Sequence, residues 1–314
     1  MALEVLREGG MLTTVQDLGR YGYQRYGVPV AGAMDQFALR AANLLVGNPP
    51  DAAALEITMT GPTLRATDKC LIAVTGADLA LRVNNWEMPP WMAILVRQGW
   101  IIEFGGRRTG CRAYLAVAGG IKVTPVIGSR STYLGGGFGG FEGRALRQND
   151  LIPLSGASFH SLSLAGRSFP PDLIPNYSQA PEIRVVLGPQ DDYFTDEGIA
   201  TFLSSEYQVS PASDRMGYRL RGPEIAHQGR ADIISDGIAL GSVQVPADKQ
   251  PIVMMADHQT VGGYPKIATV ISADIPLLAQ CLPNQSAVTF EAVSVGEAQL
   301  RYRRMMKALS HVRH

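Results

Sequence analysis

The stretch ADHQTVGGYP, residues 256–265, gathers polar side chains around a Gly-Gly pair between two apolar runs. The flanking runs, PIVMM (251–255) and IATVI (267–271), have the composition of strands. Buried polar groups need hydrogen-bond partners, and glycine lets the backbone approach a ligand closely. The stretch therefore predicts either a site or a turn that satisfies its own backbone, and its candidate side chains are Asp257, Gln259, Thr260 and Tyr264.

Strand-like segments recur along most of the chain. They are short, apolar and separated by turn residues, at a spacing of roughly 8–15 residues that is typical of an all-β barrel or sandwich. The 34 glycines and 20 prolines favour many turns over long helices. We therefore expect a mainly β fold with a few helices.

Three segments carry helix signals. Asp35 is a suitable N-cap and Gly47 a suitable left-handed C-terminal residue for a helix over residues 35–46. A second helix is expected over residues 192–203. The last helix begins with the capping box formed by Ser294 to Glu297.

A serine- and proline-rich segment, residues 156–182, loses apolar periodicity and indicates a linker. It predicts an N-terminal domain over residues 1–178, which contains the helix near 35–46. The C-terminal domain is expected over residues 179–314 and ends in the last helix. A length of 314 residues allows two domains of ordinary size.

The composition excludes several classes of function. A net charge of zero disfavours nucleic-acid or anionic-membrane binding, because both require a basic surface. No secretory signal and no membrane-spanning apolar run is visible. The histidines form no metal-ligand pattern, and three widely separated cysteines, Cys70, Cys111 and Cys281, indicate free thiols. We expect a cytoplasmic protein without a metal, a nucleic-acid partner or a membrane.

Two polar sets place an acid next to a guanidinium. The first contains Gln16, Asp17 and Arg20, and the second contains Ser213, Asp214 and Arg215. In each set the charged groups either pair with each other or leave the planar guanidinium to bind a carboxylate or phosphate. Similar sets in both halves of the chain indicate a cleft between the halves.

The glycine-rich segment GGGFGG, residues 135–140, matches the pattern GxGxxG only formally. It is not followed by an apolar-periodic helix, so a dinucleotide fold is disfavoured. The open alternatives are a loop that closes over a ligand or packs on a partner, and a plain surface turn. The glycines concerned are Gly135, Gly136, Gly137, Gly139 and Gly140.

Several motifs in order resemble one known family. They are TVQDLGR (14–20), GVP (27–29), GAMD (32–35), AANLLVGN (41–48), AVAGGI (116–121), GSRST (128–132), the loop 135–144, SDRMGYRL (213–220), GSVQVP (241–246) and DHQTVGGYP (257–265). The chain resembles the allophanate hydrolase subunit 2-like, or biotin-dependent carboxyltransferase-like, family over nearly its whole length. That family includes the C subunit of bacterial 5-oxoprolinase, half of the urea carboxylase carboxyltransferase domain, and a regulator that binds a kinase inhibitor.

The resemblance implies two cyclophilin-like β-barrel lobes and a heteromeric complex, in direct contact with a B-like subunit and together with an A-like subunit. The leading implied activity is ATP-dependent hydrolysis of 5-oxoproline to glutamate, with Mg and with no activity of this chain alone. One alternative is a biotin-dependent carboxyltransferase half for urea or a similar amide. The other is a regulator without catalysis.

The amide or lactam substrates of this family present an N–H beside a C=O. The carboxamide of Gln16, Gln244 or Gln259 can bind both groups, and Asp257 can accept the N–H. Arg20 or Arg215 can bind a carboxylate or a phosphate. We expect catalytic roles for Asp257, Gln259 and Arg215, and substrate binding by Gln16, Asp17, Arg20, Ser213, Asp214, Gln244, Thr260 and Tyr264.

Overall fold

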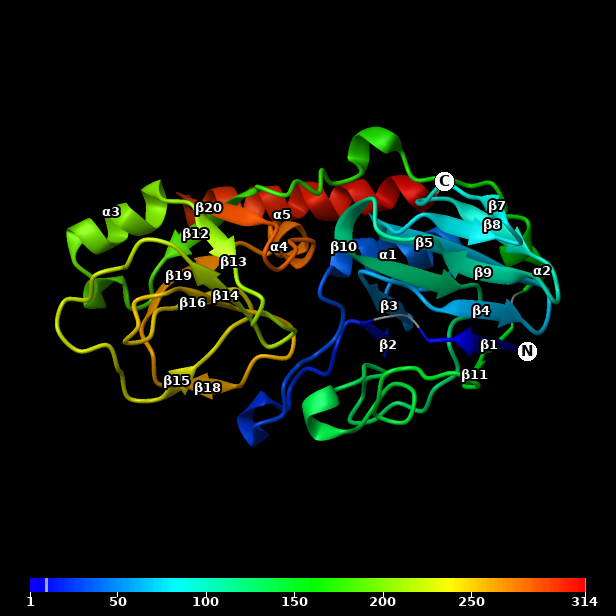
Figure 1. Ribbon diagram of the computed structural model, residues 1–314, viewed down its shortest axis with the longest axis horizontal. Helices are drawn as coiled ribbons and strands as arrows, with labels where there is room; N and C mark the ends of the chain where they lie inside the picture. The colour runs from blue at the N-terminus through cyan, green and yellow to red at the C-terminus, as the bar shows by residue number, and fades with distance from the viewer. Residues whose placement is uncertain (9–10, 157, 314) are drawn as a thin grey trace. The chain divides into compact units, whose positions relative to one another are not determined.

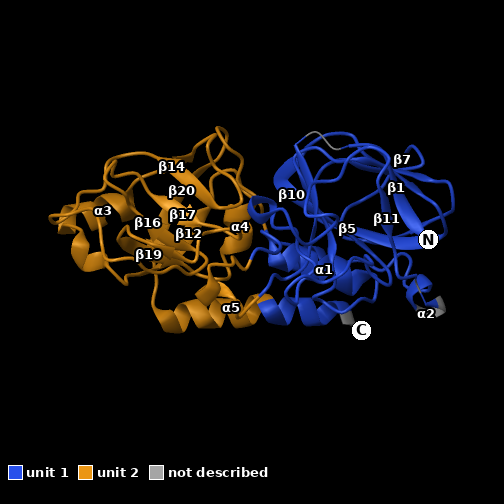
Figure 2. Ribbon diagram, turned by 90° about the horizontal axis from the view of Figure 1, so that it is seen from below, with its two compact units in different colours: residues 1–20, 31–175, 306–314 blue, residues 21–30, 176–305 orange. Residues whose placement is uncertain are grey.

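The chain folds into two compact units, which Figure 2 shows in blue and orange. The computed structural model describes residues 1–8, 11–156 and 158–313. Unit 1 comprises residues 1–20, 31–175 and 306–314, and unit 2 comprises residues 21–30 and 176–305. The mainly β fold class predicted from the sequence is confirmed. The division near residue 175 lies close to the predicted boundary. However, residues 21–30 belong to unit 2 and residues 306–314 belong to unit 1.

Unit 1 contains two antiparallel sheets (Figure 1). The six-stranded sheet has the order β11-β1-β4-β9-β6-β7, and the five-stranded sheet has the order β2-β3-β10-β5-β8. The strands are β1 (Ala2–Arg7), β2 (Leu12–Gln16), β3 (Ala54–Thr58), β4 (Thr63–Ala66), β5 (Cys70–Asp78), β6 (Leu81–Val83), β7 (Trp86–Glu87), β8 (Ala93–Val96), β9 (Ile101–Phe104), β10 (Thr109–Val117) and β11 (Leu151–Pro153). Short helical segments are η2 (Leu134–Gly136), α2 (Phe159–Leu162), η3 (Pro171–Leu173) and η5 (His311–Arg313).

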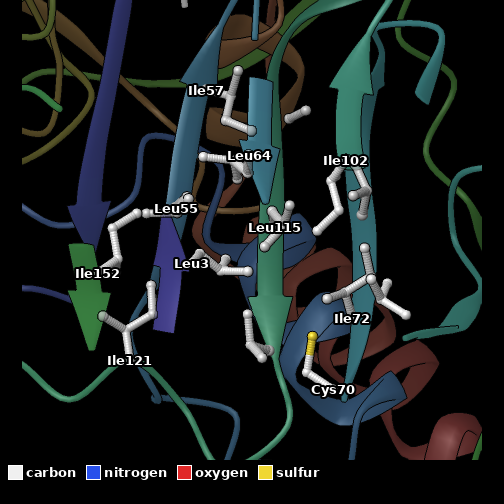
Figure 3. Close-up of a cluster of buried hydrophobic side chains, with 14 of the residues drawn as sticks. Leu3, Leu55, Ile57, Leu64, Cys70, Ile72, Ile102, Leu115, Ile121 and Ile152 are labelled. Carbon is white, nitrogen blue, oxygen red and sulfur yellow. The ribbon is translucent and has the colours of Figure 1, made fainter. Parts of the chain in front are cut away.

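The core of unit 1 draws aliphatic side chains from both sheets (Figure 3). Leu3 and Leu64 come from the six-stranded sheet, and Leu55, Ile72 and Leu115 come from the five-stranded sheet. All five are fully buried. Burial of an aliphatic side chain of this size contributes roughly 1.5–3 kcal/mol, so this shared cluster stabilises both sheets together.

The other face of the five-stranded sheet is covered by helix α1 (Gln36–Leu45), which contacts β5 and β10. The helix begins after Asp35, whose Oδ1 accepts a hydrogen bond from Ala38 N at 2.8 Å, and Gly47 follows its end with a φ of 77°. The predicted helix and its N-cap are therefore confirmed. Because β10 has partners on both faces, its residues after Thr109 are buried rather than alternating.

Unit 2 is built on a closed barrel of seven strands in the order β12-β19-β16-β17-β14-β13-β20. Parallel pairing of β20 with β12 closes the barrel. Its strands are β12 (Glu182–Leu187), β13 (Tyr207–Val209), β14 (Gly217–Arg221), β16 (Ser242–Gln244), β17 (Ile252–Met254), β19 (Lys266–Val270) and β20 (Ala287–Ala292). A separate ribbon pairs β15 (Asp236–Gly237) with β18 (Val261–Gly262).

Helical elements of unit 2 are η1 (Gln24–Tyr26), η4 (Asp191–Tyr193), α3 (Asp196–Ser204), α4 (Ile275–Ala279) and the first part of α5 (Val295–Ser310). Helix α3 begins later than predicted, because Phe194 is extended and Thr195 is the N-cap. Helix α5 begins as predicted, with Ser294 Oγ accepting from Glu297 N at 3.2 Å. The Glu297 carboxylate binds Arg301 at 2.6 Å, so only half of the capping box forms. Within the described residues, no helix combines the length and the apolar character needed to cross a membrane.

Candidate functional site

The outer wall of the unit 2 barrel presents a cross-strand row of three side chains. Arg219 on β14 pairs in register with Ile252 on β17, and Ile252 pairs with Gln244 on β16. Residues opposite each other on neighbouring strands share a face of the sheet. The next residues, Tyr218 and Val253, are buried in the barrel core, so the row faces outward.

This outer wall is the floor of a pocket of about 360 Å³. Gly217, Ile252 and Met254 form its apolar part, and a Cβ added to Gly217 would lie 3.1 Å from the Ile252 side chain. The remaining lining residues are Asp214, Met216, Arg219, Gln244, Pro246, Asp248, Gln259 and Tyr264. A pocket of this volume suits a small molecule. It brings together four residues predicted from the sequence: Asp214, Gln244, Gln259 and Tyr264.

The two carboxamides of the pocket meet at Gly262. A Cβ at Gly262 would lie 2.8 Å from Gln244 Nε2 and 3.6 Å from Gln259 Nε2. Gln244 Nε2 donates to Tyr264 O at 3.3 Å. The Gly-Gly pair thus lets the loop between β17 and β19 approach Gln244 closely, which is the close backbone approach that glycine permits.

Arg215 and Asp257 form a two-pronged ion pair with distances of 2.9 Å for Nε–Oδ2 and 3.0 Å for Nη2–Oδ1. Both side chains are 6% exposed. The adjacent backbone is also joined, since Asp257 N donates to Arg215 O and Met255 N donates to Met216 O. Neither Arg215 nor Asp257 is among the residues that line the pocket. The pair instead ties together the two loops that do line it, and the predicted catalytic role of both residues stays a prediction.

Ser213 and Asp214 shape the turn before β14. Asp214 Oδ1 accepts from Met216 N at 2.8 Å and from Gly217 N at 3.1 Å. Ser213 Oγ accepts from Arg219 N at 3.0 Å. These contacts are those of a turn stabilised by short polar side chains. Asp214 nevertheless lines the pocket, so its predicted contact with a substrate stays open to test.

Strand β18 is part of the loop between β17 and β19, and its partner β15 binds this loop. Thr260 O accepts from Ile238 N at 3.0 Å. Lys266 Nζ, which is almost fully buried, lies 2.7 Å from Asp236 Oδ2 and 3.0 Å from Gly237 O. The ribbon is therefore attached to β19 of the barrel by the contact between Lys266 and Asp236.

His258 is buried beside the ion pair. Burial lowers its pKa below the ordinary value of 6.5, although the hydrogen bond to Gln259 and the charge of Asp257 act in the opposite direction. Its Nδ1 lies 2.7 Å from Gln259 O. Because a carbonyl oxygen only accepts, Nδ1 carries the proton and the ring fixes the backbone of Gln259.

The first polar set lies in unit 1, where Asp17 is an acceptor for several donors. Asp17 Oδ1 accepts from Ser129 Oγ and Ser131 Oγ, each at 2.6 Å, and from Gly19 N at 2.8 Å. Asp17 Oδ2 accepts from Arg130 N. Asp17 thereby joins the segment after β2 to residues 129–131. Gln16, fully buried at the end of β2, donates to Thr14 Oγ1 and Thr132 O.

Arg20 is 1% exposed and lies beneath the glycine-rich loop. Its guanidinium donates to Ser131 O and is 5.0 Å from the Phe138 ring centroid. A Cβ at Gly139 would lie 2.1 Å from Ser131 O and 2.9 Å from Arg20 Nη2. Glycine at this position therefore allows the loop to lie directly on Arg20. The predicted binding of substrate by Gln16, Asp17 and Arg20 stays a prediction.

The glycine-rich loop also lines a pocket of about 390 Å³ in unit 1. Gly137, Gly139 and Gly140 contribute to it together with Phe138, Phe141, Glu142 and Lys122, whereas Gly135 and Gly136 do not. Gly137, Gly139 and Gly140 all have positive φ, which explains the choice of glycine. Among the described residues no group of three or more His, Cys, Asp or Glu side chains could hold a metal ion.

The sequence model described as "Carboxyltransferase domain, subdomain A and B" matches residues 26–292, which include the whole unit 2 pocket. The chain belongs to this carboxyltransferase-domain family. It is 39% identical over 302 residues to the 5-oxoprolinase C subunit of Escherichia coli strain K12, covering 94% of this chain and 93% of that relative. It is 38% identical over 285 residues to the 5-oxoprolinase C subunit of Haemophilus influenzae, covering 91% and 89%.

Part of a larger solved structure is also similar to this chain. The crystal structure of the Kluyveromyces lactis urea amidolyase aligns with a TM-score of 0.93 and 32% sequence identity. The alignment covers 99% of this chain, and the chain spans 20% of the length of that protein.

Arg219, Met216 and Asp248 line the unit 2 pocket but were not predicted from the sequence. One signal for Arg219 was available. In the segment GYRLR (217–221) an alternating strand places Arg219 on the face opposite to Tyr218 and Leu220. Which of the outward residues lines a pocket depends on the neighbouring strands and loops, and their register cannot be derived from β14 alone.

Proposed function

We propose that this chain is the C subunit of an ATP-dependent 5-oxoprolinase, which converts 5-oxoproline to glutamate. The observation that carries the proposal is the similarity to two 5-oxoprolinase C subunits, which extends over about nine tenths or more of each chain. The proposal includes assembly with A-like and B-like partners, and no turnover by this chain alone.

The unit 2 pocket has the chemistry that a lactam requires. A lactam presents a C=O acceptor and an N–H donor in one plane. The carboxamides of Gln244 and Gln259 offer both donors and acceptors, and the Asp214 carboxylate is a further acceptor. Ile252 and Met254 provide an apolar floor for the methylene groups of the ring. We assign lactam binding to this pocket.

The Arg215–Asp257 pair then acts as a support for the pocket. It holds the turn 213–217 against the loop 255–265, and both segments contribute lining residues. Preorganised groups bind a substrate without a reorganisation cost, so a fixed loop matters for affinity and rate. Asp257 and Arg215 are thus proposed to influence activity by positioning Gln259 and Met216.

Lys122 and the loop 137–143 in unit 1 fit a phosphate group. Their pocket combines one ammonium with glycine backbone and two phenylalanine rings, and backbone N–H groups near positive-φ residues suit anions. The Glu142 carboxylate also lines this pocket, and Arg144 Nη2 lies 2.6 Å from it and balances its charge. These are the residues of this chain that we propose to hold a phosphate of ATP with its Mg. Bound ATP supplies a phosphoryl group that activates the stable lactam oxygen for hydrolysis.

A carboxyltransferase half acting on urea or a similar amide is the second candidate, and the likeness to the urea amidolyase structure favours it. In that case the cofactor would be biotin, as the carrier of the carboxyl group, rather than ATP. The same carboxamides would then bind the amide of urea, so the pocket alone does not separate the two functions.

A substrate comparison tests the proposed function. This chain is assembled with its A-like and B-like partners and supplied in separate reactions with 5-oxoproline, with and without ATP, or with urea and a carboxylated biotin carrier as the carboxyl donor. Release of glutamate that requires ATP supports the proposed function. Carboxylation of urea that requires a biotin carrier, without release of glutamate, overturns it in favour of the second candidate.

A further inference from the structure

Arg219 is the guanidinium that lines the unit 2 pocket. It lies on the outward face of β14, two strands from Gln244, with Ile252 between them. Neighbouring strands are about 4.8 Å apart, so the backbone positions of Arg219 and Gln244 are separated by roughly 10 Å. The pocket therefore has a cationic side and a carboxamide side, with an apolar floor between them.

The other charged groups of the pocket leave Arg219 available. Within the described residues Arg219 forms no ion pair, whereas Arg215 is held by Asp257. Asp214 Oδ1 is occupied by two backbone donors, and Asp248 Oδ1 accepts from Gln250 N at 3.3 Å. An arginine in this setting can bind a carboxylate through two parallel hydrogen bonds.

5-Oxoproline has the matching distribution of groups. Its lactam nitrogen is bonded to the C=O carbon on one side and to the carboxylate-bearing carbon on the other, and two methylene groups join these two carbons across the five-membered ring. When the lactam C=O contacts the carboxamides of Gln244 and Gln259, the methylene groups cover Ile252 and the carboxylate faces Arg219. Urea has an amide but no carboxylate, and thus has no group for Arg219.

We infer that Arg219 binds the substrate carboxylate and selects carboxylate-bearing lactams over neutral amides. The inference rests on the proposed function, because it places the lactam in the unit 2 pocket. It assigns the carboxylate to Arg219 rather than to Arg20 or Arg215, whose guanidiniums are almost fully buried.

Calorimetric binding to the assembled complex tests the inference with two probes. One is 5-oxoproline, and the other is its primary amide, in which the carboxylate is replaced by a neutral group. The variants are Arg219→Gln, Arg219→Lys and the matched control Arg221→Gln. Arg221 also lies on β14 and is exposed, but it does not line the pocket.

We expect Arg219→Gln to raise the Kd for 5-oxoproline by about 10- to 100-fold, because a charge-assisted bond to the carboxylate is lost. Arg219→Lys has an intermediate effect, and Arg221→Gln has none. The Kd for the primary amide is the same in the wild type and in Arg219→Gln.

An equal loss for both probes, or no loss for 5-oxoproline, overturns the inference, as does a wild-type complex that binds neither probe. Charge-dependent binding of 5-oxoproline without ATP-dependent release of glutamate has a different meaning. It supports the role of Arg219 in binding and overturns the proposed function.

Discussion

Asp257 receives both prongs of the Arg215 guanidinium, at 2.9 Å and 3.0 Å, in a setting where each side chain is 6% exposed. The two residues are 42 positions apart in the sequence, and each lies beside a loop that lines the unit 2 pocket. The order of the pocket therefore depends on an ion pair outside it.

Removal of one partner from this pair should be costly. Asp257→Ala leaves the buried Arg215 guanidinium without its carboxylate, and we expect the free energy of unfolding to fall by about 3–5 kcal/mol. The double variant Arg215→Met/Asp257→Leu removes both charges and should recover most of that loss. Urea denaturation of the three proteins measures the difference.

Activity of the same double variant separates two roles. If the pair only positions the loops, the double variant regains much of the activity of the assembled complex along with its stability. If Asp257 acts on the substrate directly, stability returns without activity. Full activity of Asp257→Ala would contradict both roles.

Alanine variants of Gly262 and its neighbour Gly263 form a matched pair that tests the position of Gln244 in the pocket. A Cβ at Gly262 would lie 2.6 Å from Ile238 Cδ1 and 2.8 Å from Gln244 Nε2, whereas a Cβ at Gly263 meets its nearest atom at 3.5 Å. Gly262→Ala should displace the Gln244 carboxamide and reduce kcat/KM for the lactam by at least about 10-fold, as an error of 1 Å in positioning can do. Gly263→Ala should leave kcat/KM nearly unchanged, and equal kinetics of the two variants would contradict the assignment of Gln244.

Gly139 and Gly137 test how the glycine-rich loop lies on Arg20. Both have positive φ, of 74° and 64°, so alanine costs each about 1–2 kcal/mol of backbone strain. Only Gly139→Ala adds a clash, because its Cβ would lie 2.1 Å from Ser131 O, while the Cβ at Gly137 meets nothing within 4 Å. We expect Gly139→Ala to destabilise the chain clearly more than Gly137→Ala in thermal unfolding. A similar Tm for the two variants would show that the loop does not lie against Ser131.

His258 should make stability depend on pH. Its pKa is lowered in the folded chain relative to 6.5, so the unfolded chain binds the proton more readily. The stabilising effect of neutral His258 is complete above pH 6.5 and is lost as the pH falls through its folded pKa. The slope of the free energy of unfolding against pH in this range is at most about 1.4 kcal/mol per pH unit for one group.

His258→Asn is the test of this pH effect, because asparagine keeps a donor for Gln259 O but does not titrate. The variant should show a shallower loss of stability below pH 6.5 than the wild type. Parallel stability curves for the two proteins would exclude His258 as the source.

Local signals in the sequence were enough to predict several elements. Asp35 and Gly47 mark the ends of α1, because caps act through neighbouring residues. The polar composition of residues 256–265 predicted either a site or a turn, and Gln259 and Tyr264 do line a pocket. The predicted start of α3 was wrong by several residues. Thr195 is the N-cap because Phe194 before it is extended, which the sequence pattern did not indicate.

Other features depend on contacts between distant segments. The pairing of Arg215 with Asp257 and the row from Arg219 to Gln244 both follow from the register of β14, β17 and β16. A shift of one residue would turn each side chain to the other face of the sheet, and sequence periodicity does not fix that register between strands. Arg219 was missed for this reason.

Release of glutamate from 5-oxoproline by the complex of this chain with its A-like and B-like partners tests the central claim most directly. The rate is measured with and without ATP, and again after this chain is omitted. We predict glutamate that appears only with ATP and only when this chain is present. Glutamate release that is unchanged when the chain is omitted, or its absence from the fully assembled complex, would contradict the proposed function.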